Sequence, residues 1–195
     1  VQAGSPGAWS DLGFLASGST PGSPGPPRLA QEARERRNCL IAMLLCLYRL
    51  LFLPVLLVLA PGYLLRMRRR GGYGSQFGQR FGSHPRWPAK RPGTRRVWLQ
   101  AVSVGEMLAI GPLLEGLRAD GAEVYLTTTT STGFRVAADR YAPLTMGIGY
   151  FPLDWWPFAA RAWRRIDPDL VILTEGERWP EHLHQAARRG VPVLS

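Results

Sequence analysis

The chain has 195 residues, 46% of them hydrophobic, and 24 Lys and Arg against 14 Asp and Glu, which gives a formal net charge of +10 at pH 7. This length suffices for one sizeable α/β core and is too short for most complete two-domain enzymes. The two cysteines, Cys39 and Cys46, cannot form a disulfide framework or a zinc ribbon, so we expect neither a secreted disulfide-rich scaffold nor a cysteine-based metal site.

Residues 1–38 are dominated by Gly, Ser, Pro and Ala and contain few apolar side chains. A segment of this composition cannot bury enough surface to offset the conformational entropy of the chain. We therefore expect residues 1–38 to be a disordered leader.

Residues 39–65 are the most apolar run of the chain and are expected to form a membrane anchor helix. Arg49 is the only charged residue in this run, and residues 50–65 carry no charge. At about 1.5 Å per residue the whole run reaches across a hydrocarbon core of about 30 Å, whereas the uncharged part alone is slightly short. Two alternatives stay open. One is a buried core helix, and the other is a helix lying in the membrane interface, which Arg49, Pro54 and Pro61 favour.

Residues 66–96 contain ten basic residues and no acidic one. A basic segment directly after an apolar run is typical of a patch that faces anionic headgroups, at about 1 kcal/mol per basic residue near the surface. The positive-inside rule then places the rest of the chain on the cytoplasmic face of the membrane. No recognition helix or aromatic stacking platform accompanies the patch, so we expect no nucleic-acid partner. The arginines assigned to the membrane surface are Arg66, Arg68, Arg69 and Arg70.

From about residue 97 onward, short strand-like runs alternate with helical patterns. The expected strands are residues 97–103, 124–128, 147–152, 170–174 and 191–194. The expected helices are residues 106–118, 131–141, 155–166 and 179–189. This alternation predicts right-handed βαβ crossovers, and so an α/β, Rossmann-like parallel sheet with helices on both faces. Ligands of such sheets bind at the carboxyl ends of the strands.

The turn from the first expected strand to the first expected helix reads SVGE, from Ser103 to Glu106. Gly105 permits a tight turn and the close approach of a ligand, and Glu106 falls in the first helical turn, where the helix dipole favours an ionised carboxylate. A carboxylate at this edge can accept a proton from a substrate hydroxyl. The alternative, that Glu106 only caps the helix, is the more common role of a first-turn acid.

Two further carboxylates, Glu175 and Glu177, follow the fourth expected strand in the run TEGERWP, in which Pro180 suits the first turn of the next helix. At this edge of the sheet they could bind sugar hydroxyls or hold Glu106 in place. They could equally pair with Arg178 and nearby arginines in an ordinary surface network, and the residues alone favour neither reading.

The hydroxyl-rich run 127–133, TTTTSTG, leads into the second expected helix, whose free N–H groups could receive an anion. Capping of that helix by Thr130 or Ser131 is the simpler role, because the run has neither a Walker lysine nor a GxGxxG pattern. The histidines lack metal-ligand spacing, since His182 and His184 would face apart on a helix. We therefore predict no catalytic metal and no cofactor.

Several strings in this order resemble the 3-deoxy-D-manno-octulosonic acid (Kdo) transferase family of Gram-negative bacteria. They are QRFG at 79–82 after an apolar N-terminus, WLQAVSVGE at 98–106, TTTTSTG at 127–133, YFPLD at 150–154 and TEGERWPEHLHQAARRGVPVL at 174–194. The resemblance covers roughly residues 43–194, which correspond to the membrane anchor and the N-terminal half of the family pattern.

This resemblance implies a membrane-associated enzyme of the glycosyltransferase-B fold, with two Rossmann-like domains facing a cleft. It would move Kdo from CMP-Kdo to a lipid A precursor in lipopolysaccharide biosynthesis, at the cytoplasmic face of the inner membrane. Glu106 inherits the role of general base, with Glu175 and Glu177 in support. The residues to which we assign substrate binding are Ser103, Gly105, Thr130, Ser131 and Trp179.

The chain also departs from the family pattern. It has Gln100, Gly176, Arg178 and Glu181 where the pattern has His, Thr, Leu and Asn. It also stops at Ser195, before the C-terminal domain that binds the CMP-sugar in this fold. We therefore expect residues 97–195 to be the acceptor-binding half and not to turn over alone. The alternative function is a catalytically inactive, membrane-anchored lipid- or sugar-binding domain.

Overall fold

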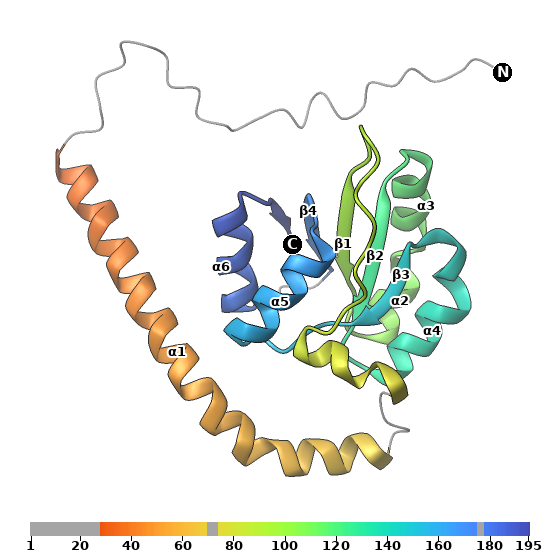
Figure 1. Cartoon of the computed structure of the whole chain (residues 1–195), viewed down its shortest axis with the longest axis horizontal. Helices are drawn as coiled ribbons and strands as arrows, with labels where there is room; N and C mark the ends of the chain where they lie inside the picture. The colour runs from red at the N-terminus through yellow and green to blue at the C-terminus, as the bar shows by residue number, and fades with distance from the viewer. Residues whose placement is uncertain (1–27, 70–73, 175–177) are drawn as a thin grey trace. The chain divides into compact units, whose positions relative to one another are not determined.

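A computed structural model describes residues 28–69, 74–174 and 178–195 of the chain (Figure 1). The chain divides into two compact units, Val1–Ala42 and Met43–Ser195. The second unit holds the C-terminal part of the first helix and the whole β-sheet. The site described below therefore belongs to this second unit.

The first helix, α1, runs from Arg28 to Arg69 and continues through Pro54 and Pro61. It begins well before Cys39, so the expectation of disorder is wrong for residues 28–38. This stretch consists largely of Leu, Ala, Gln, Glu and Arg, which are strong helix formers, and its acids and bases can pair at helical spacing. Residues 1–27 lie outside the described part of the chain.

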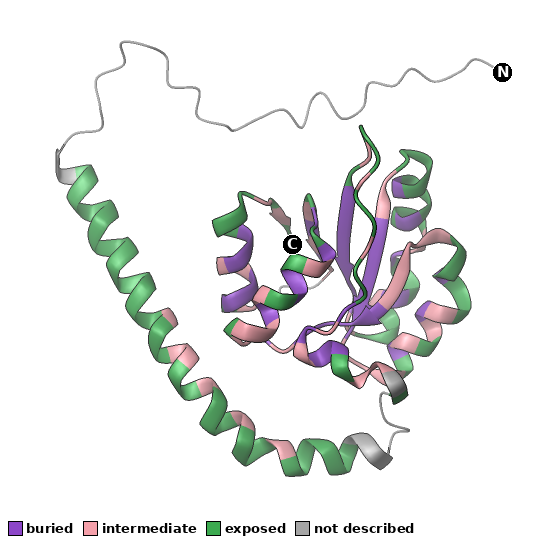
Figure 2. Cartoon of the chain, viewed as in Figure 1, coloured by how far each residue is buried: buried purple, intermediate pink, exposed green. Residues whose placement is uncertain are grey.

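Helix α1 is long and apolar enough to cross a membrane, judged by its length and composition. The candidate span is Ala30–Arg66, and only 6% of its most apolar window is buried. Figure 2 shows the helix exposed along nearly all of its length. Within the described residues, the helix is therefore not a buried core helix.

A five-stranded, all-parallel sheet lies at the centre of the second unit, in the strand order β3-β2-β1-β4-β5 (Figure 1). The strands are β1 (Arg96–Gln100), β2 (Glu123–Thr128), β3 (Gly147–Tyr150), β4 (Leu170–Leu173) and β5 (Val193–Leu194). This order, with the first strand in the middle, confirms the expected Rossmann-like α/β sheet. The carboxyl ends of β1, β2 and β4 are neighbours, which brings the loops that follow them together.

Helices cover both faces of the sheet: α5 and α6 lie on one side, and α2, α3 and α4 on the other (Figure 1). The α-helices after α1 are α2 (Val104–Ala109), α3 (Gly111–Ala119), α4 (Ser131–Tyr141), α5 (Trp156–Ile166) and α6 (Pro180–Arg189), and the 3₁₀ helices are η2 (Gly74–Phe81) and η3 (Ala142–Leu144). One helix was expected over residues 106–118, where the structure has both α2 and α3. The helix breaks there because Pro112 has no N–H to continue the hydrogen-bond ladder and starts a new helix instead.

The core between the sheet and the helices α5 and α6 is built from large aromatic side chains. Trp98 on β1 contacts Trp163 on α5, with ring centroids 5.4 Å apart, and it also contacts Phe151, which follows β3. All three rings are almost fully buried. Burial of such rings contributes strongly to stability, so the core holds the loops at the carboxyl edge on a rigid base.

Two of the ten basic residues between 66 and 96 belong to the folded interior. The side chain of Arg96 is 2% exposed, pairs with Glu123 at 2.8 Å and donates to the carbonyl oxygens of Pro88 and Ile166. Arg80 is buried as well and donates to the carbonyl oxygen of Phe151. These two arginines are therefore not available to a membrane surface, and the expected basic patch is smaller than the sequence suggests.

Candidate functional site

Glu106 lies at the carboxyl end of β1 and begins α2. Its backbone N–H donates to Ser103 Oγ at 3.1 Å, while its carboxylate accepts the backbone N–H of Ser103 at 2.8 Å. This reciprocal pair is a capping box. The capping role that the sequence left open is thus confirmed, and it fixes the orientation of the carboxylate.

The same carboxylate has two more donors. The backbone N–H of Val102 donates to Glu106 Oε2 at 2.9 Å, and the hydroxyl of Thr174, which follows β4, donates to the same oxygen. Partial burial alone would raise the pKa of Glu106. The hydrogen bonds from Ser103, Thr174 and the backbone outweigh it, so that the pKa lies below its ordinary value. Glu106 is therefore ionised at neutral pH and able to accept a proton.

The hydroxyl-rich turn after β2 lies beside the Glu106 loop. Thr130 caps α4 by accepting the backbone N–H of Gly133 at 3.0 Å, as one of the two expected capping residues. The hydroxyls of Thr128 and Thr130 both donate to the carbonyl oxygen of Val102 at 3.4 Å. Because Val102 also donates to Glu106, the turn and the carboxylate are joined through one residue.

A cleft of about 410 Å³ opens next to this turn. Its walls are formed by Phe52, Tyr63, Arg66, Arg80, Trp179 and the residues 129–132 and 151–154. Two arginines and several hydroxyls therefore face a space with mostly apolar walls. A group that is apolar on one side and anionic or hydroxylated on the other fits this lining.

The structure divides the predicted site residues into two groups. Ser103 and Gly105 belong to the Glu106 loop, whereas Thr130, Ser131 and Trp179 line the cleft. The lining of the cleft does not include the Glu106 loop, and Val102 joins Glu106 to Thr130.

Some predicted residues cannot be placed. Glu175 and Glu177 lie outside the described residues, and so does Arg70. Arg68 and Arg69 belong to the last turn of α1, and the structure does not describe their side chains. Arg66 is the one member of the predicted membrane-surface group whose side chain is described, and it is exposed at the cleft.

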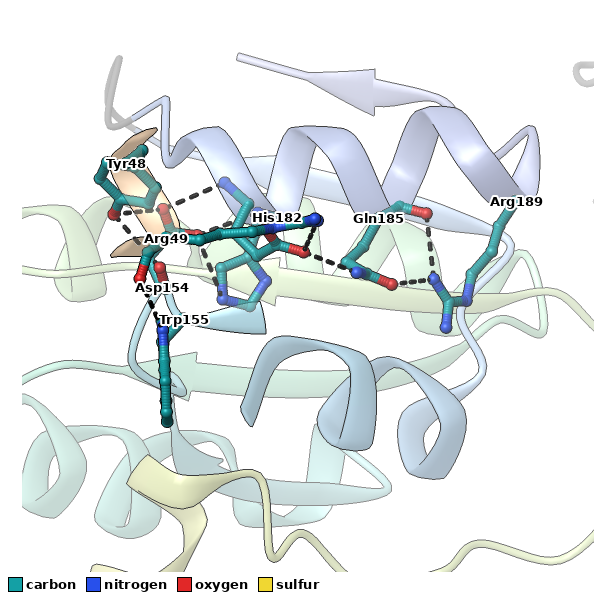
Figure 3. Close-up of polar contacts among 8 residues, drawn as sticks. Tyr48, Arg49, Asp154, Trp155, His182, Gln185 and Arg189 are labelled. Atoms are coloured by element: carbon teal, nitrogen blue, oxygen red, sulfur yellow. Dashed lines mark hydrogen bonds and ion pairs between the residues drawn. The ribbon is translucent and has the colours of Figure 1, made fainter. Parts of the chain in front are cut away.

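Asp154 is a buried residue of the cleft that the sequence reasoning missed. Its carboxylate accepts the backbone N–H groups of Glu181 and His182 at 3.1 and 2.9 Å, and the hydroxyl of Tyr48 at 2.8 Å (Figure 3). It thereby caps α6, whose own first residues offer no side-chain cap. Burial raises the pKa of Asp154 more than these hydrogen bonds lower it.

A usable signal for Asp154 was present in the sequence. The side chains of Trp179 and Pro180 at the start of α6 cannot accept an N–H, so the first N–H groups of α6 need an acceptor from another segment or from water. Thr174 had a weaker signal, as a hydroxyl residue at the carboxyl end of β4. Neither residue has a sequence neighbour that identifies its partner, which is why only the folded chain reveals both contacts.

The buried histidines have structural partners. His182 Nδ1 accepts the indole N–H of Trp163 at 3.0 Å, and His84 Nδ1 lies 2.9 Å from the hydroxyl of Tyr125. Burial lowers the pKa of both histidines to about 3, so both rings are neutral at pH 7. In the part of the chain that the structure describes, no three His, Cys, Asp or Glu residues are grouped as a metal site.

A parallel sheet of this order, with the carboxylate of Glu106 at its carboxyl edge, defines a Rossmann-like α/β domain. Residues 75–195 match the model of the family described as 3-deoxy-D-manno-octulosonic-acid transferase (kdotransferase), and the chain therefore belongs to this family. Members of this family are glycosyltransferases by name.

Curated relatives agree with this assignment. The chain is 38% identical over 135 residues to a 3-deoxy-D-manno-octulosonic acid transferase of Bordetella pertussis, covering 66% of this chain and 31% of the relative. It is 30% identical over 150 residues to the transferase of Haemophilus influenzae (74% and 31%) and 28% identical over 152 residues to that of Chlamydia pneumoniae (76% and 34%). The chain thus spans about a third of the length of these relatives. No solved structure matches the chain.

Proposed function

We propose that the protein to which this chain belongs is a glycosyltransferase that moves Kdo from CMP-Kdo to a lipid A precursor, and that residues 97–195 are its acceptor-binding domain. In this proposal the CMP-Kdo donor binds to a second domain of a glycosyltransferase-B fold, across a cleft from the edge that carries Glu106. The protein acts at the cytoplasmic face of the inner membrane. Lipid A precursor and the membrane are its partners, and nucleic acid is not.

The geometry of Glu106 is the observation that carries this proposal. Its carboxylate is ionised, is oriented by the capping box and lies at the ligand edge of the sheet. In the proposed reaction it removes the proton from an acceptor hydroxyl as the hydroxyl oxygen attacks the anomeric carbon of Kdo, while the bond from that carbon to the CMP phosphate breaks. The proton stays on Glu106, and the negative charge leaves with CMP.

The cleft beside the turn after β2 also supports this proposal. The exposed Arg66 lies on it together with the hydroxyls of the turn after β2. An anionic, sugar-bearing lipid matches this lining, because arginines bind anionic groups and hydroxyls bind sugar hydroxyls. Thr130, Ser131 and Trp179 would then contact the acceptor, and Glu175 and Glu177 would support the acceptor or the base.

The test is the substitution Glu106→Gln in the whole protein. Glutamine keeps the bond from the N–H of Ser103 through its amide oxygen, but it cannot take up a proton, and its amide nitrogen faces the N–H of Val102, which loses its acceptor. We expect Kdo transfer to fall by about 10² to 10⁴, whereas the lost bond should lower the free energy of unfolding by only about 1 to 3 kcal/mol and leave the protein folded. Glu115→Gln, on the exposed surface of α3, is the matched control and should leave the rate unchanged. Equal rates in both variants would show that Glu106 is a cap and not a base.

A further inference from the structure

Helix α1 is held to the α/β domain at the only charged residue of its apolar run. The guanidinium of Arg49 donates to both carboxylate oxygens of Glu181, at 2.8 and 3.1 Å, and the side chain of Glu181 is completely buried (Figure 3). The carbonyl oxygen of Arg49 accepts the indole N–H of Trp155 at 3.2 Å, and Tyr48 donates to Asp154. These contacts, here called the Arg49 clasp, fix the start of the run 50–65 against a polar domain.

The other end of the run 50–65 also lies against this domain, because Tyr63 and Arg66 line one cleft together with residues 129–132. Only four residues separate the end of α1 at Arg69 from Gly74, so these two residues are at most about 18 Å apart. Gly74 begins η2, which packs on the domain: Gln79 accepts the N–H of Tyr150 at 2.7 Å, and Phe81 contacts Phe158 with ring centroids 5.1 Å apart.

A helix whose two ends are tied to one polar domain cannot cross a bilayer, because crossing would place its ends on opposite sides. The run 50–65 is also about 24 Å long, less than the hydrocarbon thickness of about 30 Å. On the other side of Arg49, the uncharged apolar residues 39–48 would cover only about 15 Å. We therefore propose that the run 50–65 lies in the plane of the membrane surface, with its outer face among the lipids.

The exposure of the run agrees with this placement. Phe52, Leu56 and Ala60 recur every four residues on one helix face and are partly covered. The opposite side chains are open: Leu50 is 71% exposed and Val58 78% exposed. Open apolar side chains over an entire helix face need a cover. The exposed Arg66 and the arginines that follow it in the sequence identify that cover as an anionic lipid surface and not a neutral partner.

The placement is tested by depth measurements on the whole protein. Leu50, Leu57 and Leu64 are exposed and spaced seven residues apart, so they share one helix face. Each is changed to Cys in a background in which Cys39 and Cys46 are replaced by Ala, and labelled with an environment-sensitive fluorophore. The vesicles contain phosphatidylcholine and phosphatidylglycerol, with nitroxide lipids that quench at the headgroup, at a shallow acyl carbon or at a deep acyl carbon.

In the plane of the surface all three labels should lie at a similar depth, about 5 to 10 Å below the headgroups, with the shallow acyl nitroxide quenching best at each position. In a membrane-crossing helix, the label at position 57 would lie about 10 Å deeper than the labels at 50 and 64, since seven residues rise about 10 Å. Strongest quenching of position 57 by the deep nitroxide would overturn the proposal. Failure of the protein to bind the vesicles would overturn it as well.

A second pair of variants tests the Arg49 clasp itself. Arg49→Leu removes the clasp and joins residues 39–65 into one uncharged run, which is long enough to cross a bilayer. We expect the label at position 57 to move to the deep nitroxide in this variant, while Arg49→Lys, which keeps the charge opposite Glu181, retains the shallow pattern. Circular dichroism checks that both variants are folded. An unchanged shallow pattern in folded Arg49→Leu would contradict the role of the clasp.

Discussion

Replacing Gly133 by alanine tests how tightly α4 is packed against the hydroxyl turn. Gly133 is the third residue of α4, and an added Cβ would lie 2.6 Å from Thr128 Oγ1 and 2.8 Å from Thr130 Oγ1. Real Cβ atoms do not approach hydroxyl oxygens so closely. Either the cap of α4 must break or the start of α4 must move away from β2.

The expected magnitude combines three contributions. Alanine in place of glycine favours a helix by up to about 1 kcal/mol. Overpacking costs about 1 to 3 kcal/mol, and loss of the Thr130 cap costs about 1 kcal/mol more. Gly133→Ala should therefore lower the free energy of unfolding by about 1 to 3 kcal/mol.

Gly116→Ala is the matched control. Gly116 lies inside α3, is exposed and has no atom within 4 Å of an added Cβ. This variant should gain about 1 kcal/mol, because only the helix propensity changes. Urea unfolding of the detergent-solubilised protein, followed by tryptophan fluorescence, measures both. A shift of the midpoint in the same direction for both variants would show that α4 does not pack tightly against the hydroxyls of Thr128 and Thr130.

Two further predictions concern buried groups. Arg96→Met should lower the free energy of unfolding by about 3 to 5 kcal/mol in urea, because it leaves the carboxylate of Glu123 without its partner. Lys90→Met, at an exposed ion pair, should cost no more than about 1 kcal/mol. Equal losses in the two variants would contradict the buried role of Arg96. In NMR titrations His182 should remain neutral down to about pH 4, since its pKa in the folded protein is about 3. Its contribution to stability is complete above its pKa in the unfolded chain, near 6.5, and is lost as the pH falls from there towards 3. Protonation of His182 near pH 6 in the folded protein would contradict its burial.

The sheet could be predicted from the sequence because its strands are short, apolar and separated by helices with clear periodicity. The helix Ser131–Tyr141 begins and ends where the pattern places it, since Thr130 is a local cap. The break at Pro112 was equally local and was still missed, because the apolar spacing continues across it. Hydrophobic patterns therefore show where helices and strands lie better than they show where one helix ends and the next begins.

The remaining features depend on contacts between distant segments. The sequence predicts Arg80 and Arg96 as surface charges, because their partners are distant in the sequence. Arg80 donates to the carbonyl oxygen of Phe151, and Arg96 pairs with Glu123. Arg49 pairs with Glu181, 132 residues further along the chain. Glu106 was predicted correctly as a first-turn residue at the carboxyl edge of the sheet, since its capping partner, Ser103, is local. The hydrogen bond that Thr174 donates to Glu106 could not be predicted, because only the folded sheet brings β4 beside β1.

The most direct test of the proposed function is a transfer reaction with the whole gene product, CMP-Kdo and a purified lipid A precursor, followed by mass spectrometry of the lipid. We expect the lipid to gain the mass of at least one Kdo residue, and we expect this product to be lost when Glu106→Gln replaces the wild type. A lipid that binds to the protein but never gains Kdo would contradict the proposal and leave a binding domain in its place.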